Sequence, residues 1–404
     1  MLDGWLKNIK LETGFDTQDG ITRTRTGLFN ACIRDGRFEQ VTREPVPGGA
    51  PAHDARGLLM VPGYADMHCH IDKTFFGDEW QAVITDPSRG LMGFIEDETR
   101  MYPTLKTTTE YRATQVLATF ARTGCTRVRT HVDIVKGLKA GHLEGVRRAL
   151  ESFGPAIEYE IVAFPQHGLL RSDSYGSLDE ALRNGATLLG GIDPVDMDGD
   201  RERSLDLTME LAVKHDVDID FHLHEGGEVG FQSYRHFLRL VQAAGWQERV
   251  TLSHAFFLRS LSPDRLEETA RELAANGISL ATAATQVNSC PDFPFLERHG
   301  VRVMVGQDVM FDCWSPFCSG NIIERLESFC RMYYYRREKE LAYTLRFITG
   351  GITPIGDDNQ RAWPRSGDPA SFNLVDAACS AHVIARRREV ACAVRNGHVS
   401  HGSL

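Results

Sequence analysis

Short apolar runs alternate with amphipathic segments through the middle of the chain. Eight of these runs are predicted to be strands, at 58–68, 127–134, 159–166, 188–194, 218–225, 250–256, 278–283 and 301–308. Helical periodicity lies between most of them, at 107–123, 143–152, 204–215, 230–244 and 262–276. This alternation is typical of an α/β fold of the (β/α)8 TIM barrel type, which takes roughly 250 residues. A doubly wound open sheet is the alternative, but no GxGxxG motif follows any run.

Both ends of the chain have a different pattern, with short strands and turns. Hairpins are predicted around Asp35-Gly36 and Asn396-Gly397, because these dipeptides favour tight turns between strands. We therefore expect residues 1–57 and 364–404 to form one small β-sandwich domain. The barrel domain would then occupy residues 58–363.

Composition and charge narrow the classes of function. The 404 residues are 42% hydrophobic and 25% charged, as in an ordinary soluble protein with a large core. The net charge of -10 argues against nucleic acid as a partner, because phosphate backbones bind basic surfaces. No apolar run approaches the roughly 20 residues of a membrane span. The nine cysteines include no CxxC pair, which is typical of a reduced, cytoplasmic protein.

Polar side chains gather where the predicted strands end. His68 and His70 end the first run, and their i, i+2 spacing points both to one face of a strand. Because barrel chemistry sits at the carboxyl ends of the strands, we expect these histidines to meet the polar residues that end the other runs. Those residues are His131, Asp133, Gln166, Asp193, His222, His224, Glu225, His254, Gln307 and Asp308.

Two histidines from the first strand, one from the fifth and a carboxylate from the eighth would supply three nitrogens and one oxygen. Such a set suits Zn²⁺ or Fe²⁺ with room for a water molecule. Glu225 comes three residues after His222 and would stand beside that water as a proton shuttle. Strand parity does not separate His222 from His224 as the ligand, since both would face the same way.

The ordered motifs HCH, FPQ, HLHE, SHAF and GQD resemble those of the amidohydrolase superfamily, in its cytosine deaminase-like branch. The longer strings HIDKTF and GQDVMFDCW strengthen the resemblance, which spans nearly the whole chain. It implies a metal-dependent hydrolase that removes an amino or alkylamino group from a small nitrogen heterocycle, such as a pyrimidine or a triazine. By analogy it also implies assembly into a homo-oligomer.

The resemblance gives each motif residue a role. One divalent metal ion, zinc or iron, would be held by His68, His70, His222 and Asp308. Glu225 would move a proton from water to a ring nitrogen, while His254 and Asp308 stabilise the intermediate. Gln166 would hydrogen-bond a carbonyl or amide edge of the substrate, and Trp314 would wall the pocket.

Two departures from the family pattern bear on substrate and metal number. Cytosine deaminases carry two consecutive aspartates where this chain has Asp308 and Val309. Valine removes a polar contact, which argues against cytosine and favours a more apolar or N-substituted substrate, such as an alkylamino-triazine of the N-isopropylammelide type. No lysine ends the third or fourth run, which argues for one metal ion rather than two bridged by a carboxylated lysine. Opening of a cyclic amide ring is the alternative reaction, although such enzymes usually need that lysine.

Several polar residues near the motifs have no assigned role. His131 and Asp133 are interpreted as packing at the barrel mouth or behind the ligands, satisfied by hydrogen bonds. Asp72 and Lys73 could form an ion pair that supports a loop, or could contact the substrate. The acidic run 96–98 is interpreted as a solvated helix face.

The alternative to an enzyme is a binding protein that has kept this scaffold but lost its catalytic activity. Such a protein would purify without stoichiometric metal.

Overall fold

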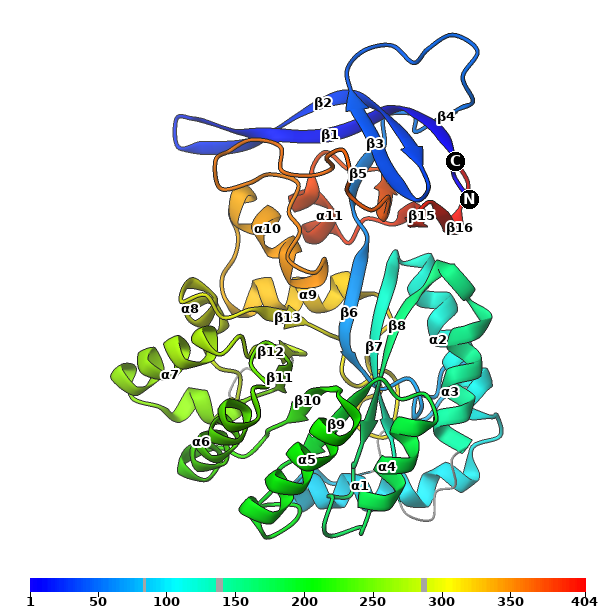
Figure 1. The fold of residues 1–404 in the computed structure, drawn as a ribbon. Helices are drawn as coiled ribbons and strands as arrows, with labels where there is room; N and C mark the ends of the chain where they lie inside the picture. The colour runs from blue at the N-terminus through cyan, green and yellow to red at the C-terminus, as the bar shows by residue number, and fades with distance from the viewer. Residues whose placement is uncertain (83–84, 136–140, 285–288) are drawn as a thin grey trace.

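The computed structural model describes residues 1–82, 85–135, 141–284 and 289–404. Two sheets organise them, one built from both ends of the chain and one from its middle (Figure 1). The N- and C-termini lie close together beside the first sheet, while the second sheet and its helices make up the larger body. The prediction of a (β/α)8 barrel with a small β domain from both termini is confirmed.

The barrel is an eight-stranded parallel sheet in which each strand pairs with the next along the chain. Its strands are β6 (Tyr64–Cys69), β7 (Cys125–Asp133), β8 (Glu158–Phe164), β9 (Leu188–Ile192), β10 (Asp218–His222), β11 (Val250–Ser253), β12 (Ser279–Thr282) and β13 (Val303–Val305). A parallel bridge between Cys69 and Asp308 brings the first and last strands together. Near-continuous apolar runs suit these strands, because helices cover the outside of a parallel barrel.

Helices connect the barrel strands and cover them. The α-helices are α1 (Gly90–Met101), α2 (Thr109–Arg122), α3 (Gly141–Ser152), α4 (Tyr175–Arg183), α5 (Arg201–His215), α6 (Gly227–Ala244), α7 (Pro263–Ala275), α8 (Phe293–Arg298), α9 (Ile322–Met332), α10 (Glu338–Thr344) and α11 (Ser380–Arg386). Short 3-10 turns lie at Pro87–Arg89, Tyr102–Thr104, Gly154–Ala156, Phe256–Ser260 and Leu345–Ile348. The five predicted helical segments correspond to α2, α3, α5, α6 and α7.

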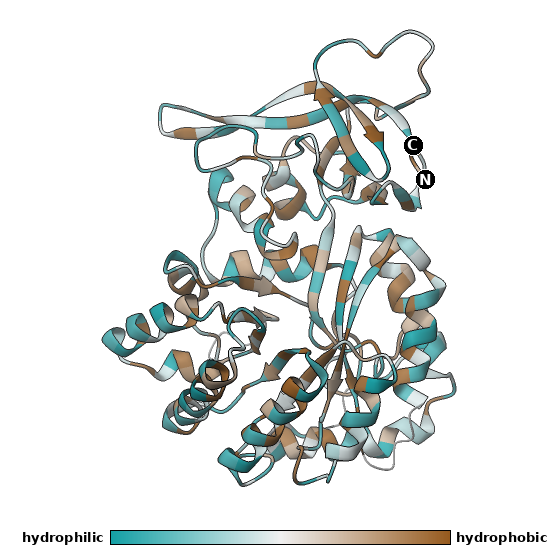
Figure 2. Cartoon of the chain, viewed as in Figure 1, coloured by the Kyte–Doolittle hydropathy of each residue, from teal (hydrophilic) through white to brown (hydrophobic). Residues whose placement is uncertain are grey.

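Figure 2 shows hydrophilic residues on the outer helices and hydrophobic residues along the strands. In the described parts of the chain, every helix is too short or too polar to cross a bilayer.

The terminal sheet joins strands from opposite ends of the chain. It comprises β1 (Gly4–Gln18), β2 (Ile21–Arg34), β3 (Arg37–Thr42), β4 (Ala52–Asp54), β5 (Leu59–Pro62), β14 (Phe372–Val375), β15 (Val390–Arg395) and β16 (His398–Gly402). Both predicted hairpins are present, with Arg34 opposite Arg37 and Arg395 opposite His398. Apolar residues of β1, β2, β3, β5, β14 and β15 share one core.

One strand prediction was wrong, since the run 58–68 is two strands rather than one. β5 pairs with β14 of the terminal sheet, and Gly63 N then donates to Ser371 O. The next residue, Tyr64, donates to Gly124 O and begins the barrel. The Pro-Gly pair at 62–63 is the break, because proline and glycine both interrupt strands. Leu59 to Pro62 therefore pair in the terminal sheet, while the division of the chain at residues 57 and 364 stays a prediction.

A buried carboxyl links β1 to α11. Glu12 is only 1% exposed, and its two oxygens accept from the backbone N–H of Ser380 at 2.6 Å and from the Ser380 hydroxyl at 3.0 Å. Burial raises the pKa of Glu12 from 4.5 to about 7, although the hydrogen bonds from Ser380 act in the opposite direction. The fold therefore favours the protonated carboxyl. Stability from Glu12 is complete below pH 4.5 and is lost as the pH rises to about 7.

Replacing Glu12 with glutamine should therefore change the pH dependence of stability. Glu12→Gln cannot ionise, so its free energy of unfolding relative to the natural protein should rise by about 2 kcal/mol between pH 5 and pH 8. Chemical denaturation at the two pH values measures this difference. Glu44→Gln, at an exposed position, is the control and should show no such trend. An equal effect of Glu12→Gln at both pH values would contradict the prediction.

Candidate active site

Four buried imidazoles meet at the carboxyl ends of three barrel strands. His68 and His70 come from the end of β6, His131 from β7 and His222 from β10. One ring nitrogen from each lies within 4.8 Å of the others, and all four side chains are buried. The rings of His68, His131 and His222 have centroids 4.6–4.7 Å apart. The structure thus brings three of the predicted ligands together and adds His131, which sequence reasoning had interpreted as packing.

Asp308 reaches the same place from the last barrel strand. Its Oδ1 lies 3.4 Å from His68 Nε2 and 3.5 Å from His70 Nε2. Its φ of +59° is uncommon for a residue with a side chain, and such conformations gather at functional sites. Burial alone would raise the pKa of Asp308, but the neighbouring imidazoles of His68, His254 and His70 hold it well below its ordinary value. The carboxylate is therefore ionised.

This set of donors fits a divalent metal ion. His68 Nε2, His70 Nδ1 and both ring nitrogens of His222 are buried without a hydrogen-bond partner. An unpaired buried polar atom costs about 1–3 kcal/mol, a cost that a cation would remove by accepting the nitrogen lone pairs. Burial, reinforced by neighbouring imidazoles, holds the pKa of His70 and His222 well below the ordinary value. The rings therefore stay neutral, which is the form that binds metal.

A serine determines which nitrogen of His68 carries the proton. Ser253 Oγ donates to Asp220 Oδ1 at 2.7 Å and lies 2.9 Å from His68 Nδ1. Asp220 is paired with Arg129 at 2.9 Å, so it is a carboxylate that only accepts. Since the hydroxyl has a single hydrogen, its oxygen must accept from His68 Nδ1–H. The lone pair of His68 is then on Nε2, which faces Asp308.

The interpretation of His131 as a residue satisfied by hydrogen bonds was wrong. Both of its ring nitrogens lack a hydrogen-bond partner, although Nε2 lies 3.3 Å from Asp220 Oδ1. Burial lowers the pKa of His131, despite the opposing effect of Asp220. His131 therefore adds a fourth neutral imidazole to the cluster.

His224 lies past the end of β10 and is held by Asp193. Asp193 Oδ1 accepts from His224 N at 2.6 Å, and its Oδ2 lies 2.7 Å from His224 Nδ1. The parity argument, by which His222 and His224 would face the same way, does not apply, because β10 ends at His222. Among the described residues, the groups with converging donor atoms include His222 and not His224. The geometry thus favours His222 as the ligand.

His254 stands beside Asp308 directly after β11. One of its ring nitrogens lies within 4.8 Å of donor atoms of His68 and Asp308. Its φ is +71°, and its ring stacks on His224 with centroids 4.4 Å apart. Burial, together with the nearby His224, holds the pKa of His254 well below its ordinary value. A neutral imidazole in this position can donate one N–H hydrogen bond into the site.

Glu225 is buried and its carboxyl group is held by three donors. Oε1 accepts from Val195 N at 2.6 Å and from Asp196 N at 3.1 Å, and Oε2 accepts from Ser233 Oγ at 2.5 Å. Burial raises the pKa of Glu225 above its ordinary value, even though these hydrogen bonds lower it. In the described part of the chain, Glu225 belongs to none of the groups with converging donor atoms. This placement suits proton transfer better than metal ligation.

Sequence reasoning missed a buried charged network around Lys73. Its Nζ lies 2.8 Å from Gln166 Oε1, 3.4 Å from Asp133 Oδ1 and 3.7 Å from Glu98 Oε2. Asp72 does not take part in these contacts; its Oδ2 instead accepts from Asp133 N at 2.9 Å. Lys73 is thus tied to Asp133, Glu98 and Gln166 rather than to its neighbour in sequence.

The interpretation of residues 96–98 as a solvated face was wrong for Glu98. Glu98 is 1% exposed and accepts hydrogen bonds from Tyr102 OH, at 2.7 Å, and from Trp314 Nε1. Helical spacing was the missed signal, because Glu98 follows Ile95 by three residues and lies on the apolar face of α1. Asp97 is also buried, where it pairs with Arg89 at 2.7 Å.

Trp314 and α1 enclose this side of the site. The indole of Trp314 stacks on Phe94 with centroids 5.0 Å apart and an interplanar angle of 13°. A cavity of about 720 Å³ beside α1 is lined by Ile95, Val135 and His167, among others. His167 follows Gln166, so this cavity lies at the carboxyl end of the barrel, as the chemistry requires.

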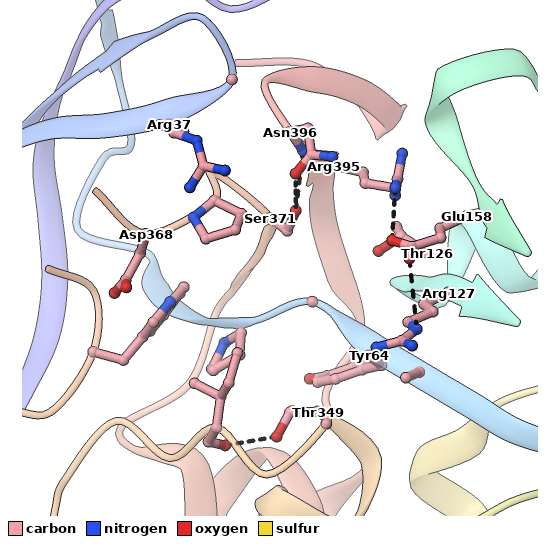
Figure 3. Close-up of a pocket in the computed structure, with 18 of the residues that line it drawn as sticks. Arg37, Tyr64, Thr126, Arg127, Glu158, Thr349, Asp368, Ser371, Arg395 and Asn396 are labelled. Carbon is pink, nitrogen blue, oxygen red and sulfur yellow. Dashed lines mark hydrogen bonds and ion pairs between the residues drawn. The ribbon is translucent and has the colours of Figure 1, made fainter. Parts of the chain in front are cut away.

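A second large cavity, of about 780 Å³, lies at the opposite end of the barrel (Figure 3). Its barrel wall includes Tyr64, Arg127 and Glu158, which stand at the amino ends of their strands. Arg127 and Arg395 both pair with Glu158, at 3.8 Å and 2.6 Å. This cavity separates the barrel from the terminal sheet and contains none of the predicted site residues.

Comparison with known proteins identifies relatives along the whole chain. Residues 76–401 match the model of the Amidohydrolase family. The chain is 34% identical to the uncharacterized protein YahJ of Escherichia coli, over 99% of this chain and 88% of that protein. It is similar to the crystal structure of N-isopropylammelide isopropylaminohydrolase from Burkholderia multivorans, with a TM-score of 0.86, 28% identity and 98% of each chain covered. The structure of 5-methylcytosine deaminase from Klebsiella pneumoniae has a TM-score of 0.80 at 23% identity, covering 99% and 98%, and shares the fold.

The hydrogen bond between Ser253 and His68 gives a test of the metal site. Ser253→Ala should weaken zinc binding about 10- to 100-fold, because His68 loses the acceptor that fixes its ring. Competition with a chromophoric chelator measures the affinity. Ser400→Ala, in the terminal sheet, is the matched control and should bind zinc like the natural protein. Equal affinity in Ser253→Ala would show that another contact orients His68.

Proposed function

The chain belongs to the amidohydrolase family, and on that basis we propose that it is a metal-dependent hydrolase that releases ammonia or an amine from a small nitrogen heterocycle. The observation that carries the proposal is the convergence of neutral imidazoles and one carboxylate at the carboxyl ends of the barrel strands. We further propose an alkylamino-triazine of the N-isopropylammelide type as substrate. Similarity to a structure with that named activity supports this choice, as does the apolar Val309.

One divalent metal ion is proposed, with His68, His70, His222 and Asp308 as its ligands. When bound, such an ion lowers the pKa of water towards neutrality and so supplies a nucleophile. Donor atoms of His70, Asp72 and Asp133 also converge and could hold a second ion, but the ammonium group of Lys73 already lies beside them. Lys73 Nζ lies 3.4 Å from Asp133 Oδ1, which supports a single ion.

Glu225 is the proposed proton carrier. It would take a proton from the attacking water and deliver it to a ring nitrogen of the substrate. The raised pKa, caused by burial, brings this carboxyl closer to the pH at which both steps must occur. The hydrogen bonds from Val195, Asp196 and Ser233 hold the group in place. The new C–O bond forms first. The C–N bond to the amine then breaks, the oxygen stays on the ring carbon as a carbonyl, and the amine nitrogen leaves with the second proton of the water molecule.

His254 is proposed to stabilise the negative charge that develops during attack. Its low pKa keeps it neutral, and a neutral imidazole still has one N–H that can donate a hydrogen bond to this charge. Its left-handed backbone and its stacking on His224 fix the direction of the ring. Trp314 is proposed to wall the pocket, and Gln166 to bind the edge of the heterocycle.

Release of ammonia or amine from a heterocycle panel is the first test. The panel comprises cytosine, isocytosine, 5-substituted cytosines, creatinine and N-alkylated amino-triazines, assayed with zinc-loaded and iron-loaded protein. We expect turnover of the alkylated triazines. A new carboxylate in place of free amine would instead indicate ring opening. Metal-loaded protein that releases neither product would contradict the proposed reaction class.

Glu225→Gln should sharply reduce turnover while leaving the metal in place. We expect a loss of about 10²- to 10⁴-fold in kcat, because glutamine cannot carry the proton. Metal content by elemental analysis should equal that of the natural protein. Glu228→Gln, on the exposed face of α6, is the control. Retained activity in Glu225→Gln would remove Glu225 from the mechanism.

Val309→Asp tests the choice of substrate. The half-buried Val309 follows Asp308, and its backbone oxygen accepts from Arg325 at 3.2 Å. An aspartate there restores a polar contact, so the ratio of kcat/KM for cytosine to that for N-isopropylammelide should rise by about 10-fold or more. An unchanged ratio would show that residue 309 does not select the substrate.

A further inference from the structure

We propose that Lys73 is a positioning residue that fixes the carboxamide of Gln166, so that the site selects heterocycles presenting a hydrogen-bond acceptor to Gln166. A ring carbonyl oxygen is such an acceptor, and an amino group at the same place is not. This inference rests on the proposed function, since it assumes that Gln166 contacts the heterocycle.

The contact between Lys73 and Gln166 determines which end of the amide faces the substrate. Lys73 Nζ lies 2.8 Å from Gln166 Oε1. An ammonium group can only donate, so it requires the amide oxygen and would oppose the amide NH₂. Gln166 Nε2 is therefore turned away from Lys73, and none of the described residues accepts a hydrogen bond from it. The carboxamide of Gln166 thus keeps two N–H donors for the substrate.

Lys73 itself is fixed by its surroundings. It is 2% exposed, with Asp133 Oδ1 at 3.4 Å and Glu98 Oε2 at 3.7 Å. Its ammonium also faces the rings of Trp314 and Phe164, at 5.7 and 6.0 Å from the centroids. Burial disfavours the charge, but the carboxylates outweigh it and raise the pKa of Lys73 above its ordinary value. The residue is therefore a permanent cation and cannot act as a base.

The amide lies at the edge of the imidazole cluster. Gln166 follows β8, whose last residue is Phe164. The Phe164 ring lies 4.3 Å from the ring of His222 and 5.5 Å from that of His70, between centroids. On the other side, Asp133 has a donor atom within 4.8 Å of one on His70. Lys73 thus spans the short gap between the proposed metal ligands and Gln166.

Charge balance determines how Lys73 can be tested. Removing Lys73 alone would leave two buried carboxylates, Glu98 and Asp133, without their cation, which destabilises a fold strongly. Replacing Glu98 at the same time removes one of these two carboxylates, so the double variant loses one positive and one negative charge together. In Glu98→Gln, the new amide oxygen can still accept from Tyr102 or Trp314, and Lys73 keeps Asp133. We therefore compare the double variant Lys73→Met/Glu98→Gln with Glu98→Gln alone, so that the difference isolates the ammonium group.

The functional readout is discrimination between two substrates. One is N-isopropylammelide, and the other is the analogue in which an amino group replaces one ring oxygen. Relative to Glu98→Gln, the double variant should lose about 10- to 100-fold in kcat/KM for N-isopropylammelide, because the unfixed amide no longer offers its donors. The preference for N-isopropylammelide over the analogue should fall by a similar factor. Gln166→Glu, which offers only acceptors, should prefer the amino analogue. An unchanged preference in the double variant would overturn the inference.

A second readout does not depend on turnover. Protein labelled with ¹⁵N at glutamine side chains gives a Gln166 amide signal, identified by its loss in Gln166→Glu. This signal should shift or broaden in the double variant relative to Glu98→Gln, because the amide can then rotate. An identical signal in both would overturn the inference. If no heterocycle is turned over while the signal changes, the proposed substrate fails and the role of Lys73 stands.

Discussion

The contact between β6 and the segment after β13 is the constraint on which the site depends. Asp308 N donates to His68 O at 2.7 Å, and His70 N donates to Asp308 O at 3.2 Å, so the backbone that closes the barrel also sets the two imidazoles against the carboxylate. Gly306 permits this approach, because a Cβ there would lie 2.5 Å from His68 O. Asp66 strengthens the seam by accepting from the backbone of both segments, at His68 N and Gln307 N, each at 3.2 Å.

Closing the barrel in this way buries polar groups that only further polar groups can satisfy. On one side of the imidazoles, Asp220 holds Ser253 and Arg129, and Ser253 in turn holds His68. On the other side, Lys73 is surrounded by carboxylates and by Gln166. Each network joins charge of both signs, so neither leaves an isolated ion in a medium of low dielectric constant. The ring nitrogens between the networks remain unpaired, and they are the atoms available to a metal ion.

The two networks also separate the tasks proposed for the site. The serine network orients a proposed metal ligand, whereas the lysine network orients a group proposed to contact the heterocycle. Trp314 connects the second network to α1 through its hydrogen bond to Glu98, so one helix both covers the site and contributes to its charge balance. Val309 follows Asp308 directly, so the residue proposed to select the substrate lies beside this contact between β6 and the segment after β13.

The sequence by itself determined the alternation of strands and helices, the hairpins at both ends, and the histidines at the strand ends, because these depend on local periodicity and spacing. It also carried the family motifs. Only the tertiary structure decided that the run 58–68 divides between two sheets, because that division depends on pairing with β14 near the other end of the chain. Likewise, only folding brought Glu98 and Trp314 to Lys73, and His131 to His68, across long distances in sequence. A charged residue gives no local sign of its partner, so such buried networks follow from packing alone.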